Sequence, residues 1–487
     1  MRLSAAATAF FVALLVGAAA APAADIGAND DSAKHTADYG LATYSEMAAV
    51  GLRRTVIGVR FRPSQALVIQ DKELLDRIVP NALAAGLRVV LAVYPYPPRE
   101  IEARLASPAL FAGYVSAVAQ AYPQVTQFVI GNEPNQPAFW RPQFTRSGTN
   151  ASAPGFGPYL AAAYDALKAI DSTLEVIGVG LSPRGNDKPK AKNNVSTSPV
   201  RFLRALGTWY RRSGRTRPLM DSFSFHPYPN RATDPLDRGY PWPNAGFSNL
   251  GRVKQALWDA FDGTSQPTTL NGLTIHLDEV GWQVDTSLRV GYQGAENVPV
   301  TDEITQAAIY GDLIRRANCD PDVASVSFFG FRDDGLRTGF QAALLRADGT
   351  PRPAVAAVQA AIAEADSGCS EGEVPWTPAQ EVIDANVEVG IEGEATVTAR
   401  IAAGEDVRAA LCVDSLEVRG IGGAAWRSLR ISGAGCQKFA VRGLRPLNVA
   451  LAVPSGEDVR GDIMAELTAQ SNRARTTVVV HQLPTLR

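Results

Sequence analysis

Two glutamates, Glu133 and Glu279, each follow a short apolar stretch of the chain, Phe128–Ile130 before the first and Ile275–Leu277 before the second. An ionised carboxylate among buried strands lowers the stability of the fold unless it is paired, so it is commonly retained for a chemical role. Cleavage of a glycosidic bond requires two carboxyl groups, one to protonate the leaving oxygen and one to attack or to activate water. The two glutamates are therefore predicted to form such a catalytic pair.

The segments that must position this pair alternate between β-rich apolar runs and helical stretches from about residue 25 to 366. Such alternation predicts parallel strands covered by helices, and runs that are apolar throughout indicate strands buried on both faces. Eight strands with helices between them predict a (β/α)8 TIM barrel, an α/β fold. The predicted strands are Asp25–Asn29, Thr55–Phe61, Arg88–Tyr94, Gln127–Asn132, Glu175–Leu181, Asp221–Tyr228, Thr274–Trp282 and Val323–Phe331.

An open, doubly wound sheet is the competing architecture, and a glycine-rich phosphate loop after its first strand usually marks it. Here the first predicted strand leads into Asn29 and Asp30 without such a loop, so the barrel is favoured. In a barrel the active site lies at the carboxyl ends of the strands. Glu133 and Glu279 end the predicted strands 4 and 7. They are therefore expected to face each other across the mouth, where a carboxyl separation of about 5–5.5 Å would indicate a retaining enzyme and about 7–9 Å an inverting one.

The strand-end residues resemble those of the retaining glycoside hydrolases of clan A, which include the family 5 cellulases and the family 39 enzymes. The resemblance covers residues 25 to about 366. It implies that Glu133, in an Asn-Glu-Pro triplet, is the acid/base and that Glu279 is the nucleophile of a double displacement. It also implies that Asn132 binds the sugar 2-hydroxyl group and that the substrate is a glycan or glycoside, with a β linkage favoured.

Further strand-end positions match supporting residues of the clan. The resemblance implies that His226 contacts the substrate, that Tyr228 hydrogen-bonds the nucleophile and that Arg60 holds the nucleophile ionised. Two positions depart from the clan pattern, and both concern the subsite that holds the sugar. Phe329 stands where a tryptophan floor is common, and Tyr94 or Tyr96 occupies the area of a common histidine.

Several aromatic residues in the expected loops are candidates for stacking on sugar faces, although ordinary packing explains any single one about as well. Trp282 is favoured because it follows Glu279 closely. The others are Tyr96, Trp140, Tyr240 and Trp242. Two polar residues of the same predicted strand, His276 and Asp278, are expected on the strand face opposite to Glu279. There His276 would pack against a helix and Asp278 would make a structural hydrogen bond.

The N-terminus has the pattern of a secretory signal peptide, residues 1–24. Arg2 precedes an apolar run from Ala5 to Ala21, and small residues flank Pro22. The mature chain is therefore expected to be secreted or periplasmic, with no later membrane span, and export permits disulfide bonds. Four cysteines allow three pairings. Pairing within segments is favoured, which gives Cys319–Cys369 and Cys412–Cys436.

The chain changes character after residue 366. Residues 367–380 form a predicted linker that is rich in glycine, proline and charged residues, and short strand-like runs follow it. Six such runs over residues 381–487 predict a small immunoglobulin-like β-sandwich. They are Val387–Ile401, Ala409–Val418, Gln437–Val441, Leu447–Val453, Asp462–Ala469 and Thr476–His481. The 487 residues thus divide into a catalytic barrel at 25–366, a linker and an accessory domain.

The composition excludes some classes of function. Lys and Arg number 47 and Asp and Glu 49, and the formal net charge is −2. This balance argues against a nucleic-acid partner, although a local basic patch stays possible. No zinc-ligand spacing is present, so neither a metal nor a cofactor is expected, and the chain is expected to be a monomer. A non-catalytic carbohydrate-binding barrel and a transglycosylase with the same residues remain the alternatives to a hydrolase.

Overall fold

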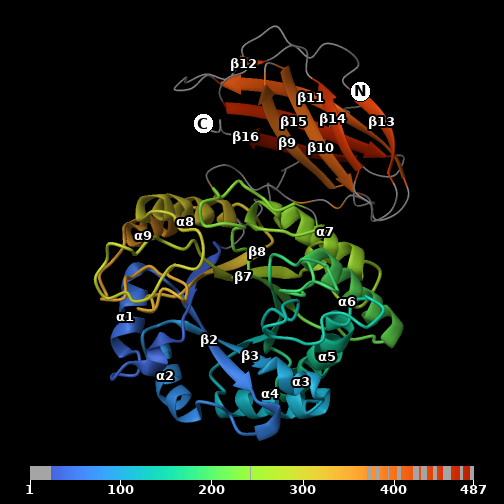
Figure 1. Cartoon of the computed structure of the whole chain (residues 1–487). Coiled ribbons are helices and arrows are strands. Elements are labelled where there is room, and N and C mark those ends of the chain that lie inside the picture. Colours follow the sequence, from blue (N-terminus) through green and yellow to red (C-terminus); the bar gives the residue numbers. More distant parts are fainter. Residues whose placement is uncertain are drawn as a thin grey trace, which may run out of the picture.

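Eight parallel strands close into a barrel, in which β1 pairs with both β2 and β8. The computed structural model describes residues 23–241, 243–369, 376 and 378, together with the backbone of the strands between residues 384 and 482. The closed barrel, surrounded by helices in Figure 1, confirms the predicted (β/α)8 architecture. Its strands are β1 (Asp25–Asn29), β2 (Arg54–Phe61), β3 (Arg88–Pro95), β4 (Gln127–Ile130), β5 (Glu175–Leu181), β6 (Ser222–Phe225), β7 (Thr274–Val280) and β8 (Val323–Phe329).

The surrounding helices bury one face against the strands. In α6, Leu203, Leu206 and Tyr210 are buried at helical spacing, Pro199 begins the first turn, and Gly214 follows the last turn with a φ of 67°. Proline is preorganised for a first turn, and glycine adopts the left-handed conformation that ends a helix. The helices are α1 (Leu41–Val50), α2 (Lys72–Ala84), α3 (Pro98–Glu102), α4 (Pro108–Ala121), α5 (Ser152–Ile170), α6 (Pro199–Ser213), α7 (Leu250–Phe261), α8 (Glu303–Asn318) and α9 (Pro353–Ala365).

The inside of the barrel holds an apolar cluster and a polar layer. Val56, Val90, Ala92, Val129 and Ile177 form the apolar cluster. In the polar layer, Nε2 of His276 lies 3.0 Å from Oε1 of Glu175, and its Nδ1 lies 2.8 Å from the hydroxyl oxygen of Ser325 and 3.0 Å from a guanidinium nitrogen of Arg54.

The prediction that His276 packs against a helix is therefore wrong. It assumed that Glu279 faces inward by strict alternation along β7, which would turn His276 outward. In the structure Ile275 and Leu277 belong to the core shared with the helices, so His276 between them faces the barrel axis. An irregularity in β7, described below, removes the conflict with an inward-facing Glu279.

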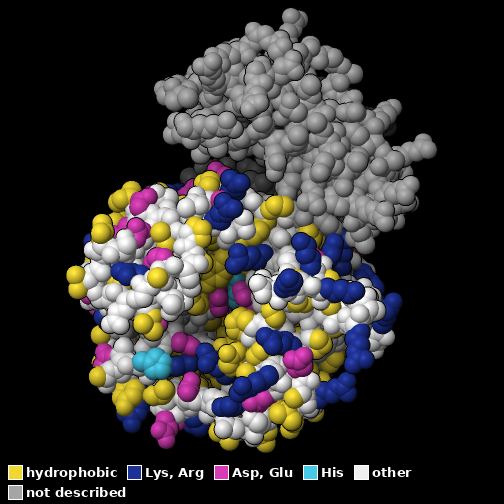
Figure 2. Space-filling model, in the orientation of Figure 1, with side chains coloured by type: hydrophobic (Ala, Val, Ile, Leu, Met, Phe, Trp, Pro, Cys, Tyr) yellow, Lys and Arg dark blue, Asp and Glu magenta, His cyan; other side chains and the backbone are white. Residues whose placement is uncertain are grey.

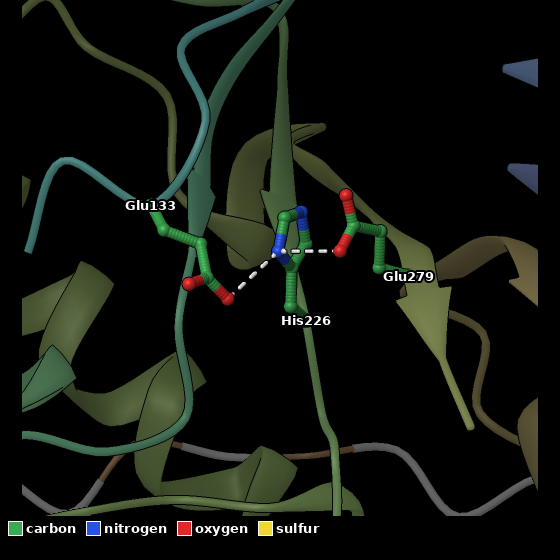
Figure 3. Close-up of side chains that lie close together, drawn as sticks. All are labelled: Glu133, His226 and Glu279. Carbon is green, nitrogen blue, oxygen red and sulfur yellow. Dashed lines mark hydrogen bonds and ion pairs between the residues drawn. The ribbon is translucent and has the colours of Figure 1, made fainter. Parts of the chain in front are cut away.

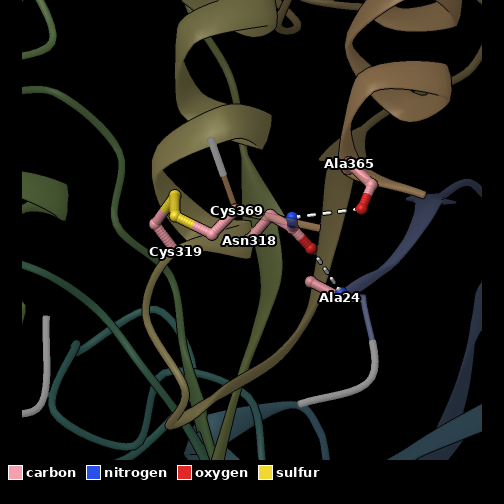
Figure 4. The surroundings of a disulfide bond; sticks show 5 residues. All are labelled: Ala24, Asn318, Cys319, Ala365 and Cys369. Carbon is pink, nitrogen blue, oxygen red and sulfur yellow. Dashed lines mark hydrogen bonds between the residues drawn. A yellow bond between two sulfur atoms is a disulfide. The ribbon is translucent and has the colours of Figure 1, made fainter. Parts of the chain in front are cut away.

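A disulfide bond joins Cys319, at the end of α8, to Cys369, shortly after α9 (Figure 4), which confirms the first predicted pair. The neighbouring Asn318 also connects distant segments. Its Oδ1 accepts a hydrogen bond from the amide of Ala24 at 3.3 Å, and its Nδ2 donates one to the carbonyl oxygen of Ala365 at 3.2 Å. The start of β1 and the last two helices of the barrel are thus held together at one corner.

Replacing both Cys319 and Cys369 by alanine is expected to lower the free energy of unfolding by about 2–4 kcal/mol. The bond joins residues 50 positions apart, and its loss gives the unfolded chain more conformations. Urea unfolding of the full chain measures the effect, and the parent protein in a reducing agent should match the variant. Equal midpoints for the oxidised parent and the variant would show that the bond contributes nothing.

The C-terminal strands lie outside the barrel (Figure 1) and form two antiparallel sheets, β14-β10-β9 and β12-β11-β15-β16, with β13 also on β11. The predicted run Val387–Ile401 is two paired strands rather than one. In the backbone register, residues 412 and 436 stand opposite each other. The side chains of Cys412 and Cys436 lie outside the described residues, so their bond stays a prediction, as does the sandwich. The strands are β9 (Asp384–Glu392), β10 (Glu394–Ala402), β11 (Val407–Arg419), β12 (Arg427–Ser428), β13 (Cys436–Val441), β14 (Leu447–Ala452), β15 (Asp462–Ser471) and β16 (Arg475–Gln482).

The signal-peptide prediction concerns residues that, except for the last two, lie outside the described ranges. Within the part of the chain that the structure describes, no helix has the length and apolar character needed to cross a membrane.

Candidate active site

Three side chains from different strand ends converge at the mouth of the barrel (Figure 3). Nδ1 of His226, just after β6, lies 3.2 Å from Oε1 of Glu133 and 3.5 Å from Oε2 of Glu279. One ring or carboxylate atom from each residue lies within 4.8 Å of the others. The glutamate side chains keep 17% and 15% of their surface exposed, so solvent reaches both. Figure 2 shows acidic and histidine side chains in the central hollow of this face.

The backbone around Glu133 has an unusual local conformation. Gly131 has a φ of 113°, and a Cβ atom there would lie 2.6 Å from the carbonyl oxygen of Val179, so glycine is required. Glu133 itself has a φ of 41°, a left-handed conformation that side chains rarely adopt. Its amide donates a 2.6 Å hydrogen bond to the carbonyl oxygen of Gly180. Strained residues of this kind concentrate at functional sites.

An irregularity in β7 directs Glu279 into the mouth. Between Leu277 and Val280, β7 advances three residues while the paired β8 advances two. Such a bulge changes the direction of a side chain, so an inward Glu279 is compatible with an inward His276. Oε2 of Glu279 accepts a hydrogen bond from the hydroxyl of Tyr228 at 3.1 Å, and Oε1 accepts one from Nδ2 of Asn29 at 3.3 Å.

Asp278 and Ser224 hold His226 from the interior of the barrel. Nε2 of His226 lies 3.4 Å from Oδ1 of Asp278, and the hydroxyl of Ser224 donates to the same oxygen. All three side chains are buried. Asp278 thus makes a hydrogen bond, as its position predicted, but it does so toward the barrel axis and to a residue of the site.

Burial and neighbouring charges act in opposite directions on the buried histidine. Burial lowers the pKa of His226, but the carboxylates of Glu279, Asp278 and Glu133 more than offset it, so its pKa lies well above the ordinary value. The neighbouring carboxylates therefore favour the protonated form of the imidazole.

Burial shifts the pKa of Glu279 in the opposite direction. Burial, together with the nearby Glu133 and Asp278, raises the pKa of Glu279 to about 7, although His226 and the hydrogen bond from Tyr228 lower it. At neutral pH this carboxyl group is therefore divided between its protonated and ionised forms.

Arg60 lies at the mouth but does not reach Glu279. Its Nε donates to the hydroxyl of Tyr94 at 3.3 Å, and its guanidinium carbon lies 5.2 Å from the ring centre of Tyr96. No described carboxylate forms an ion pair with it. The predicted contact between Arg60 and Glu279 is therefore wrong, because Tyr228 and Asn29 occupy the donor positions around that carboxylate.

The tryptophans favoured for sugar stacking are packing residues. Trp140 is 4% exposed and packs edge-on against two aromatic rings of α5. Trp282 is 2% exposed, and its Nε1 donates to the carbonyl oxygen of Asp234 at 2.9 Å. Tyr240 is also buried. The predicted stacking roles of these residues are wrong, because no ring face is open to a ligand. Trp242 lies outside the described residues.

Other aromatic side chains do face the mouth in part. Phe329, at the end of β8, is partly exposed and packs edge-on against Tyr228 and Phe340, with ring centres 6.1 and 5.8 Å away. Tyr96 is partly exposed on the side of β3. Asn132, beside Glu133, is partly exposed, and no described residue hydrogen-bonds its side-chain amide. These positions remain available for contact with a ligand.

Sequence reasoning missed two residues of this cluster, Asn29 and Phe340. Asn29 is the last residue of the first predicted strand, so the strand-end rule that selected Glu133 would have selected it as well. Phe340 lies in the long segment between β8 and α9, where no periodic pattern indicates which side chains return to the mouth.

Glu133, His226 and Glu279 are also residue types that bind metal ions. Ligation requires a neutral imidazole with a free ring nitrogen. Here both ring nitrogens of His226 face carboxylate oxygens, and those carboxylates favour the protonated ring. The described contacts fit a carboxyl pair bridged by a protonated imidazole, and the same three side chains also offer ligand atoms for a metal ion.

No protein-family model and no curated protein matches the sequence. Solved structures do match. The chain is similar to a family 39 glycoside hydrolase from Bacteroides cellulosilyticus WH2, with 15% identity, 89% of this chain and 81% of that chain covered, and a TM-score of 0.46. It is similar to a monomeric beta-xylosidase from Caulobacter crescentus CB15, with 15% identity, coverages of 90% and 98%, and a TM-score of 0.46.

A third match is a GH5_18 protein from Streptomyces cattleya in complex with GlcNAc, with 15% identity, coverages of 73% and 82%, and a TM-score of 0.49. At these identities and scores the likeness carries no information about individual residues, so the site assignment rests on the geometry described above.

Proposed function

We propose that this chain is a retaining glycoside hydrolase in which Glu279 is the nucleophile and Glu133 is the acid/base. The observation that carries the proposal is the closeness of their carboxylate oxygens, which lie within 4.8 Å at the barrel mouth. Retaining enzymes keep their carboxyl groups about 5–5.5 Å apart, whereas inverting enzymes need about 6.5–9.5 Å to hold a water molecule. At least one oxygen of each carboxyl group thus approaches the other group to within 4.8 Å, a closest approach that favours direct attack by a carboxylate.

The reaction proceeds in two displacements. An oxygen of Glu279 attacks the anomeric carbon while Glu133 donates its proton to the departing glycosidic oxygen, which leaves a glycosyl ester on Glu279. Glu133, now ionised, then removes a proton from water, whose oxygen displaces Glu279 from the anomeric carbon. The product is a sugar hemiacetal of the original configuration, and both glutamates return to their starting states.

Hydrogen-bond donors support the division of roles. Tyr228 and Asn29 each donate to Glu279, and His226 lies between the two glutamates. Donors stabilise an ionised carboxylate, which the nucleophile needs. The described side-chain contacts of Glu133, by comparison, consist of the His226 ring alone.

The test is the stereochemistry of the first product. Purified protein is screened on aryl glycosides and polysaccharides, and proton NMR of an active reaction is recorded before mutarotation. Retention of the anomeric configuration supports the proposal. Inversion would contradict the mechanism. No hydrolysis of any glycoside would favour the non-catalytic carbohydrate-binding barrel, and transfer to added sugar acceptors in place of water would indicate a transglycosylase.

A metal-dependent hydrolase is the second candidate, because Glu133, His226 and Glu279 offer three ligand atoms close together. Dialysis against a chelator separates the two mechanisms. Unchanged activity supports the carboxyl pair, whereas activity that is lost on dialysis and restored by a divalent metal supports the metal centre.

Activity is expected to fall on the acidic side with an apparent pKa near 7, because the nucleophile must be ionised. Tyr228→Phe removes a hydrogen bond that stabilises the ionised form of Glu279, so the acidic limb should move to higher pH. The measurement is kcat/KM against pH for parent and variant. Tyr122→Phe is the matched control, because Tyr122 donates to Asp76 at 2.9 Å, outside the mouth. Equal shifts in both variants would refute the role of Tyr228.

We propose further that the chain is exported after cleavage of residues 1–24, and that the C-terminal strands form a separate accessory sandwich. The Cys319–Cys369 bond supports export, since disulfide bonds persist in oxidising compartments. Mass spectrometry of protein collected from the medium or periplasm tests the cleavage site. A mature chain that still begins with residue 1 would contradict it.

A further inference from the structure

Two loops beside Glu133 carry an excess of basic side chains. The segments 131–151, after β4, and 182–198, after β5, contain only two acidic residues, Glu133 itself and Asp187. Their six basic residues are all exposed, and we call them the basic rim. Figure 2 shows Lys and Arg side chains gathered beside the central hollow of this face. The basic rim consists of Arg141, Arg146, Arg184, Lys188, Lys190 and Lys192.

The two loops form one ordered surface. The amide of Thr197 donates to the carbonyl oxygen of Asn135 at 3.0 Å, and Nδ2 of Asn135 returns a 2.9 Å hydrogen bond to the carbonyl oxygen of Thr197. Nδ2 of Asn150 donates to the hydroxyl of the same Thr197 at 2.9 Å, and Gln136 donates to the carbonyl oxygen of Arg184. The basic side chains therefore project from a scaffold that is tied to the end of β4.

The protein's own acids do not neutralise this surface. No described carboxylate forms an ion pair with any member of the basic rim. Asp187 lies 3.6 Å from Nε of Arg201 and accepts the amide of Ser198 at 2.9 Å. On the next loop, Asp234 lies 3.6 Å from Arg238, and Asp237 pairs with Arg316. The whole chain has a formal net charge of −2, so the excess is local.

The rim lies on the side of the mouth to which Glu133 belongs. The amide of Glu133 donates to the carbonyl oxygen of Gly180, two residues before the second loop, and Gln136 donates to the carbonyl oxygen of Arg184. An acid/base faces the leaving-group oxygen, so a glycan bound for cleavage extends over the loops next to it. Closely spaced unneutralised cations raise the local concentration of polyanions, and their attraction weakens as salt increases.

Accordingly, we propose that the basic rim binds an acidic glycan, one whose sugars carry carboxylate or sulfate groups, on the leaving-group side of the site. The choice of a glycan as the ligand, rather than another polyanion, rests on the proposed function. It specifies the substrate class: the sugars beyond the cleaved bond are anionic, while Glu133 and Glu279 perform the cleavage.

The experiment measures binding separately from cleavage. Full-length Glu279→Gln protein is titrated calorimetrically with polygalacturonate and with dextran sulfate, which represent the two acidic groups. Fully methyl-esterified polygalacturonate and dextran are the neutral counterparts. At least one acidic glycan should bind about tenfold more tightly than its neutral counterpart, with an affinity that falls steeply as salt rises. The acidic glycan that binds shows whether the basic rim recognises carboxylate or sulfate groups.

Charge reversal on the rim provides the specific test. Lys190→Glu combined with Lys192→Glu should weaken acidic-glycan binding by about tenfold or more, since two attractions become repulsions. The matched control is Arg212→Glu with Arg217→Glu, two exposed residues near the opposite ends of the strands. Equal binding by both double variants would overturn the inference. So would salt-insensitive binding, or tighter binding of DNA or anionic vesicles than of either glycan.

Hydrolysis by the parent protein distinguishes this inference from the proposed function. Cleavage of neutral aryl glycosides without rim-dependent binding of acidic glycans would overturn the inference and leave the hydrolase proposal intact. Rim-dependent binding of an acidic glycan by a protein that cleaves no glycoside would support the inference and overturn the hydrolase proposal.

Discussion

Glu279→Ala is expected to lower kcat/KM by about 10⁵-fold or more on every glycoside that the protein cleaves. The substitution removes the group that forms the glycosyl ester, so a better leaving group does not restore the reaction. Added azide should occupy the space that the side chain leaves and attack the anomeric carbon once, giving a glycosyl azide of inverted configuration. Product analysis by NMR and kinetics across a leaving-group series measure both effects.

Two controls accompany this prediction. Glu73→Gln changes an exposed glutamate on α2 and should leave kcat/KM unchanged. The second control is stability. The pKa of Glu279 is about 7 in the folded chain and near 4.5 in the unfolded chain, so its ionisation costs stability as pH rises through that interval. Glu279→Gln lacks this cost.

The melting temperature of Glu279→Gln at about pH 8 should therefore equal or exceed that of the parent. A much lower melting temperature would indicate that activity is lost because the fold is destabilised. Full activity in Glu279→Ala would end the hydrolase proposal.

Glu133→Ala is expected to show a selective defect, with a loss of about 10²–10⁴-fold on substrates that have poor leaving groups. An activated aryl leaving group departs with little need for a proton, so formation of the glycosyl ester should survive with such substrates. Added azide should then restore turnover, because an anion attacks the ester without a general base. The product should be a glycosyl azide of retained configuration, which the same NMR assay identifies.

The opposite pattern would reverse the roles of the two glutamates. If Glu133→Ala gave the inverted azide and Glu279→Ala the retained azide, Glu133 would be the nucleophile. This comparison is needed because the pKa of Glu279 is about 7, and a raised pKa is also expected of an acid/base. The assignment above depends on the donors Tyr228 and Asn29, and rescue chemistry tests it independently of any pKa.

Much of the barrel was predictable because its signals are local. Buried parallel strands are short runs that are apolar throughout, and helices show a different spacing, so eight alternations indicate the barrel without knowledge of distant contacts. The active-site end then follows from the direction of the strands. This reasoning selected Glu133, His226, Tyr228 and Glu279, which the structure brings together.

The partners within the site were less predictable, because a side chain's partner depends on geometry across the barrel. Arg60 was assigned to Glu279 and instead contacts Tyr94 and Tyr96. Trp282 follows Glu279 closely in sequence, yet it packs inward and donates to a backbone carbonyl. Distance along the chain does not show on which side of the mouth a ring lies.

The eight-stranded barrel, the strand ends from which the site is built and the favoured Cys319–Cys369 pair could all be predicted from local sequence patterns. The directions in which the side chains at those strand ends point depend instead on contacts across the barrel. The bulge in β7 turns Glu279 into the mouth while His276 also points inward, and strict alternation excludes that combination. The tertiary structure also decided the charge state of the site, since the pKa values of His226 and Glu279 depend on burial and on carboxylates from other strands.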